Sequence, residues 1–151
     1  MGAAYFYHLT RRSLEGALSE LLEAARKRDM VVAVRGTDLA RLSWLDEKLW
    51  LGADDGFLPH GLAGGPNDAD QPILLTMGDA ANGPACVMSV DGAVVKAEEV
   101  AALERVCILF DGNDDAQLNT ARGQWKALKD AGASAQYWSE ESGRWEKKAE
   151  T

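Results

Sequence analysis

The sequence predicts a three-layer α/β domain in which helices cover both faces of a mainly parallel sheet. Short apolar segments at residues 30–34 and 106–110 show no alternation with polar residues, which indicates strands buried on both faces. Segments with helical spacing of apolar residues follow the predicted strands, so strand and helix alternate along the chain. The chain has 151 residues, 46% of them hydrophobic, and four prolines, which is typical of one globular domain.

The first predicted elements are a strand, a helix and a second strand. Tyr5-Phe6-Tyr7-His8 forms an aromatic opening strand, and Ser13 is placed to cap a helix. Arg26-Lys27-Arg28 puts positive charge at the end of that helix, where the helix dipole is negative. Residues 30–34 then form the second strand. The apolar stripe of the helix consists of Leu14, Ala17, Leu18, Leu21, Leu22 and Ala25.

A second helix and a long connection follow. Thr37 is expected to open the helix, which ends before Gly52 and carries Leu39, Leu42, Leu45 and Leu49 on one face. Residues 50–71 are rich in Gly, Asp and Pro, and so long a connection inside one domain usually has a function. Short strands are expected at residues 73–76 and 85–90.

The last part of the chain continues the alternation. We expect a short helix at residues 96–103, a strand at 105–110, a long helix from Asn113 or Asp114 to Ala131, and a strand at 134–139. Residues 1–139 are therefore expected to form a single domain, and 140–151 a charged C-terminal tail that is prone to fraying.

Charge and apolar content exclude several classes of protein. The net charge of −8 repels polyanions, so direct binding of nucleic acid is not expected. The apolar runs are too short to span a membrane, and the N-terminus does not resemble a signal peptide, so a cytoplasmic protein is expected. Cys86 and Cys107 lie in apolar strands, which is typical of buried, reduced thiols.

The residues for common enzyme chemistry are not found in the patterns that such chemistry needs. The first strand-to-helix turn, residues 8–13, contains no glycine, which disfavours a phosphate-binding loop and predicts a Rossmann-like topology without a nucleotide site. His8 and His60 have no metal-site spacing, and His60 is expected to bond to backbone in a loop. We therefore expect no catalytic residue, no metal and no cofactor.

Two candidate binding surfaces remain. On the long helix, Arg122 and Lys126 flank Trp125, an arrangement that suits an apolar group attached to a carboxylate. The alternative is a core tryptophan beside a solvated basic face. The second candidate is Trp50 with Phe57-Leu58-Pro59, which would form a protein interface if exposed; alternatively, these side chains fold back over the sheet edge.

Five segments in order resemble the chi subunit family of the bacterial DNA polymerase III holoenzyme, over nearly the whole chain. They are Tyr5-Phe6-Tyr7-His8-Leu9, Leu45-Asp46-Glu47-Lys48-Leu49-Trp50, Gly56-Phe57-Leu58-Pro59-His60, Phe110-Asp111-Gly112 and Ala121-Arg122-x-x-Trp125-Lys126-Ala127. The resemblance implies an α/β fold and a non-catalytic DNA replication accessory subunit of the clamp loader.

The resemblance also implies partners and site residues. The accessory subunit would bind the acidic C-terminal tail of single-stranded DNA-binding protein, which ends in Asp-Phe-Pro-Phe. Arg122 would meet a carboxylate, Trp125 would pack against a phenylalanine ring, Lys126 would add a second positive charge, and Phe110 would form a pocket wall. The surface of Trp50, Phe57, Leu58 and Pro59 would hold the clamp loader's psi subunit or a helicase.

Two other functions are compatible with the pattern of residues. One is a nucleotide-dependent enzyme on a doubly wound sheet, which the fold class alone suggests. The other is a passive bridging subunit that uses the surface at residues 50–59 and leaves the helix surface idle.

Overall fold

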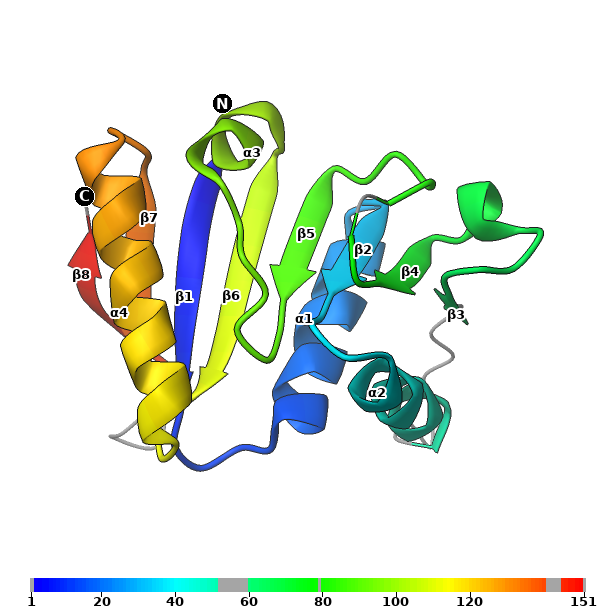
Figure 1. Ribbon diagram of the computed structural model, residues 1–151, viewed down its shortest axis with the longest axis horizontal. Helices are drawn as coiled ribbons and strands as arrows, with labels where there is room; N and C mark the ends of the chain where they lie inside the picture. The colour runs from blue at the N-terminus through cyan, green and yellow to red at the C-terminus, as the bar shows by residue number, and fades with distance from the viewer. Residues whose placement is uncertain (1, 52–59, 79, 141–144, 151) are drawn as a thin grey trace.

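A computed structural model describes residues 2–51, 60–78, 80–140 and 145–150, with the backbone alone for residues 50 and 51 (Figure 1). The described strands form one sheet in the order β3-β4-β2-β5-β6-β1-β7-β8. All neighbouring strands are parallel except β7 and β8, which are antiparallel. The strands are β1 (Ala3–Leu9), β2 (Val32–Arg35), β3 (Gly61–Leu62), β4 (Ile73–Thr76), β5 (Cys86–Ser89), β6 (Arg105–Asp111), β7 (Ala135–Ser139) and β8 (Glu146–Glu150).

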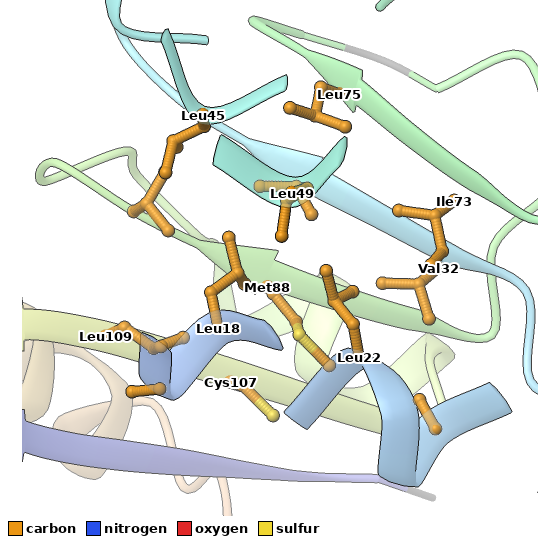
Figure 2. Packing of buried hydrophobic residues seen from close by; sticks show 14 of the residues in the cluster. Leu18, Leu22, Val32, Leu45, Leu49, Ile73, Leu75, Met88, Cys107 and Leu109 are labelled. Carbon is orange, nitrogen blue, oxygen red and sulfur yellow. The ribbon is translucent and has the colours of Figure 1, made fainter. Parts of the chain in front are cut away.

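Helices pack on both faces of the sheet. They are α1 (Leu14–Lys27), α2 (Leu39–Leu51), α3 (Ala97–Ala102) and α4 (Asp115–Asp130), with a 3-10 turn, η1, at Asp68–Asp70. Leucines of α1 and α2 join one core cluster, in which Leu18, Leu22 and Leu45 lie over Met88 and Leu109 of the sheet (Figure 2). Val100 of α3 and Leu128 of α4 join a second cluster. The two clusters confirm the predicted three-layer α/β class, and both cysteines are buried and free, as expected.

The helix starts follow from side-chain caps. Ser13 Oγ accepts a hydrogen bond from the Gly16 N–H, and the Asp114 carboxylate accepts from two N–H groups of the first turn of α4, as the sequence predicts. At α2 the prediction is wrong. The Asp38 carboxylate accepts from the Ala40 N–H at 3.1 Å, whereas the Thr37 hydroxyl donates to the Asp91 carbonyl. Helix α2 therefore begins one residue later, and Leu39 is exposed rather than part of the apolar face.

The C-terminal segment differs from the expected charged tail. Residues 146–150 form β8, the edge strand beside β7. Its Glu and Lys side chains are mostly exposed, which suits an edge strand because charge discourages pairing with another chain. Trp145, just before β8, packs edge-on against Tyr7 with ring centroids 5.2 Å apart, and so attaches this strand to the first core cluster.

The order of strands creates a switch point between β1 and β6. The chain leaves β1 through α1, which packs in the first cluster, and leaves β6 through α4, which packs in the second. The carboxyl ends of these neighbouring strands therefore send their helices to opposite faces. In open parallel sheets, such an edge is the common place for ligand binding. None of the helices in the described ranges has the length and apolar content needed to cross a membrane.

Candidate functional site

Helix α4 presents the predicted tryptophan and its neighbouring cations at the surface. Ala121 and Leu128 are buried against the sheet, which fixes the rotation of the helix. Trp125 is partly buried and packs edge-on against Phe6 at 5.3 Å and Tyr137 at 5.9 Å between ring centroids. The indole is thus held rigidly by the core but keeps part of its surface in contact with solvent.

Arg122 and Lys126 lie one turn apart on α4 and are exposed. Within the described ranges of the chain, neither side chain forms an ion pair or a hydrogen bond. Lys129, one turn beyond Trp125, is exposed as well. We name Arg122, Trp125, Lys126 and Lys129 the α4 basic surface. Because no ion pair in the described part of the chain involves these cations, they are available to an external anion.

Phe110 lies below this surface rather than on it. Its side chain is 2% exposed, and its ring contacts His8 at 5.2 Å and Tyr137 at 5.9 Å between centroids. A side chain that is this deeply buried does not suit the expected role of Phe110 as the wall of a surface pocket. It supports Tyr137, which in turn supports Trp125.

Both histidines contact other residues of the chain. His8 Nδ1 lies 2.7 Å from the Tyr137 hydroxyl, and the ring sits among the aromatic residues of the second cluster. His60 is buried, with Nε2 3.2 Å from the Asp46 carbonyl oxygen and 3.3 Å from an Asp46 carboxylate oxygen. The bond to backbone confirms the prediction for His60.

Gly112 is required by the position of His8. A Cβ at residue 112 would lie 1.8 Å from His8 Nε2 and 3.0 Å from the Leu9 carbonyl oxygen. We expect Gly112→Ala to lower the free energy of unfolding by about 1–3 kcal/mol, because the imidazole must leave its packed position. Gly123→Ala in α4 is the control: its Cβ would meet nothing within 4 Å, and alanine is about 1 kcal/mol better than glycine in a helix. Urea denaturation of both variants measures the difference, and equal stabilities would contradict the packing described.

The second predicted surface is not located by the structure. Phe57, Leu58 and Pro59 lie outside the described residues, and Trp50 is described by its backbone in the last turn of α2. The structure therefore does not test whether these four residues form one surface.

A cavity of about 580 Å³ lies at the carboxyl ends of β2 and β4, and none of the α4 basic surface lines it. Its lining includes Arg35, Lys96, Met77 and Val94, the last two being exposed apolar side chains. Arg35 makes a bidentate ion pair with Glu99, with N–O distances of 3.0 and 2.6 Å. This guanidinium is thus committed to a carboxylate of the same chain, unlike that of Arg122.

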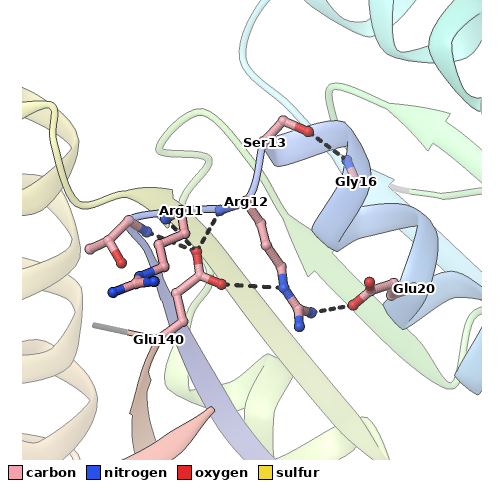
Figure 3. A network of polar contacts seen from close by, with 7 residues as sticks. Arg11, Arg12, Ser13, Gly16, Glu20 and Glu140 are labelled. Carbon is pink, nitrogen blue, oxygen red and sulfur yellow. Dashed lines mark hydrogen bonds and ion pairs between the residues drawn. The ribbon is translucent and has the colours of Figure 1, made fainter. Parts of the chain in front are cut away.

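A carboxylate at the turn between β1 and α1 was not among the predicted site residues. Glu140, directly after β7, is 2% exposed, and one of its oxygens accepts hydrogen bonds from the backbone N–H groups of Thr10, Arg11 and Arg12 (Figure 3). The sequence signal for it was an acidic residue at the end of a strand that is parallel to β1. Parallel strands end at the same edge of a sheet, so this residue reaches the turn after β1.

Glu140 makes stability depend on pH. Burial raises the pKa of this carboxyl, but the three N–H donors and the Arg12 guanidinium together lower it more, so the net shift is downward. A lowered folded pKa stabilises the protein above the unfolded value of about 4.3, and the contribution is lost as pH falls through the folded pKa. We expect the stability advantage of wild type over Glu140→Gln to be full above about pH 5.5 and to shrink below about pH 4.3. Urea midpoints across pH 2.5–7 measure it; an advantage that is constant with pH would contradict the assignment.

Comparison with known proteins adds an independent finding. The model of one protein family, described as DNA polymerase III chi subunit, HolC, matches residues 1–136. None of the curated proteins matches the chain. The matched range includes β1 through the start of β7 and all of the α4 basic surface.

Proposed function

The chain belongs to the DNA polymerase III chi subunit family, and on that premise we propose that it links the clamp-loader assembly to single-stranded DNA-binding protein by holding that protein's acidic C-terminal tail. Membership alone makes it a replication accessory protein. The link to the clamp loader and the tail-binding step are the proposal, and both belong in the cytoplasm, where replication takes place.

The α4 basic surface is the observation that carries the proposal. The molecule has a net charge of −8, yet Arg122 and Lys126 stand on this helix without acidic partners among the described residues. At physiological salt the screening length is about 8 Å, so these nearby cations dominate the potential that a docking carboxylate experiences. Local charge therefore permits an acidic tail to bind an acidic protein.

The chemistry of the tail matches the chemistry of this surface. A terminal phenylalanine offers a ring and a carboxylate on the same residue. The Arg122 guanidinium suits bidentate bonding to that carboxylate, and the exposed part of Trp125 suits contact with the ring. Lys126 supplies a second cation for a tail aspartate. Because Phe6 and Tyr137 hold the indole in place, its ordering costs little on binding.

The other partner would bind elsewhere. Trp50, Phe57, Leu58 and Pro59 are proposed as the surface for the psi subunit or a helicase, on the strength of the family resemblance. In that arrangement one molecule binds two partners at once, as a linker requires.

A direct titration tests the proposal. A fluorescent peptide that ends in Asp-Phe-Pro-Phe is expected to bind the wild-type chain, with an affinity that falls as salt rises, since ion pairs contribute. The control peptide lacks the final phenylalanine and is expected to bind at least tenfold more weakly. Equal binding of the two peptides, or binding of neither, would refute a receptor for this tail.

A further inference from the structure

The turn between β1 and α1 contains a built site for an oxyanion. The N–H groups of Thr10, Arg11 and Arg12 lie 3.0, 2.7 and 2.7 Å from the same oxygen of Glu140. Arg12 Nε lies 3.3 Å from the other oxygen (Figure 3). Successive N–H groups that converge in this way form a concavity with partial positive charge, the arrangement that many proteins use to hold phosphate. Here the bound anion is a side chain of the same molecule.

The position of this turn matches the place where ligands enter such sheets. It follows β1 at the switch point between β1 and β6, where helices α1 and α4 leave to opposite faces. The register of β1 and β7 pairs His8 with Ser139, so Glu140 is carried to the same edge. The carboxylate therefore sits where a bound anion of a doubly wound protein would sit.

Two further observations describe the fit. The Thr10 hydroxyl oxygen, on the first residue of this turn, is buried and has no hydrogen-bond partner among the residues described. The family model ends at residue 136, so Glu140 lies outside the matched range. The family assignment therefore does not account for the group that fills the turn.

We propose that residues 10–12 form an oxyanion-binding site whose ligand in the native chain is its own Glu140, and that removal of this carboxylate opens the site to free inorganic phosphate. The proposal does not depend on the tail-binding function of α4. It also gives a physical reason why a turn at the switch point would not take a nucleotide phosphate: the place is filled. We expect phosphate to bind better than acetate, because it offers more acceptor oxygens to the three converging N–H groups.

The test compares wild type, Glu140→Ala and the control Glu150→Ala, in which an exposed glutamate of β8 is removed. Each is unfolded thermally in chloride, acetate and phosphate at equal ionic strength. Phosphate at one hundred times its dissociation constant is expected to raise the unfolding midpoint of Glu140→Ala by about 5 °C or more relative to chloride. Acetate is expected to raise this midpoint less. Neither anion is expected to change the midpoints of wild type and the control. Amide NMR signals of residues 10–12 in Glu140→Ala are expected to shift on addition of phosphate.

Each outcome decides the proposal. A variant that is unfolded in chloride and folds in phosphate supports it. If Glu140→Ala fails to fold in either salt, Glu140→Ser, whose side chain is too short to reach the three N–H groups, takes its place, with phosphate-dependent shifts of the same three amides as the expected result. Absence of those shifts in a folded variant overturns the proposal. Equal phosphate binding by wild type would also overturn it, because Glu140 would then not occupy the site.

Discussion

Replacement of Glu140 by alanine is expected to lower the free energy of unfolding by about 3–5 kcal/mol, the largest effect on stability that we predict for a polar residue. The variant leaves three backbone N–H groups of the β1–α1 turn without their acceptor and the Arg12 guanidinium without its buried partner. Arg12 keeps its ion pair with Glu20, so part of the charge is still compensated.

Equilibrium urea denaturation at pH 7 in chloride measures this loss. Glu150→Ala is the matched control, because Glu150 pairs with Lys147 in an exposed position where ion pairs contribute about 0–1 kcal/mol. A Glu140→Ala variant that loses no more stability than the control would contradict the structural role of the turn.

Arg122→Ala is expected to weaken binding of the tail peptide by roughly 30- to 1000-fold, or about 2–4 kcal/mol. The exposed guanidinium of Arg122 can donate two hydrogen bonds to one carboxylate. Without it, the peptide carboxylate can interact only with the ammonium group of Lys126, which does not bind a carboxylate in this bidentate way. Because Arg122 is exposed and forms no ion pair with the residues that the structure describes, the stability of the variant is expected to stay within about 0.5 kcal/mol of wild type.

Arg28→Ala controls for the loss of one positive charge. Arg28 is exposed and caps the end of α1, on the opposite face of the sheet from α4. It is expected to change peptide affinity less than threefold. Equal losses in the two variants would mean that net charge, rather than the α4 basic surface, governs binding.

Much of this fold was predictable because its strands and helices carry strong local signals. Residues 106–110 are buried on both faces of the sheet, so their apolar run has no polar interruption. The stripe of α1 and the Asp114 cap of α4 likewise depend on neighbours within a few residues. The exposure of Arg122 and Lys126 could also be predicted from helical spacing, because it depends only on neighbouring positions of the same helix.

The remainder depends on contacts between residues far apart in the sequence. Strand β8 has no apolar alternation, and its place follows from pairing with β7 and from Trp145 on Tyr7. The burial of Glu140 depends on N–H groups about 130 positions earlier in the chain. Phe110 is the residue before the last of β6, but the rings of His8 and Tyr137 cover its side chain, and spacing along one strand could not indicate this.

The most direct measurement for the tail-binding account is amide and indole NMR of the full chain, titrated with the peptide that ends in Asp-Phe-Pro-Phe. The account predicts that the largest shifts fall on residues 118–129 and on the Trp125 indole N–H. Shifts centred instead on the cavity around Arg35 and Lys96 would contradict it, since the tail would then bind at a site that none of the α4 basic surface lines.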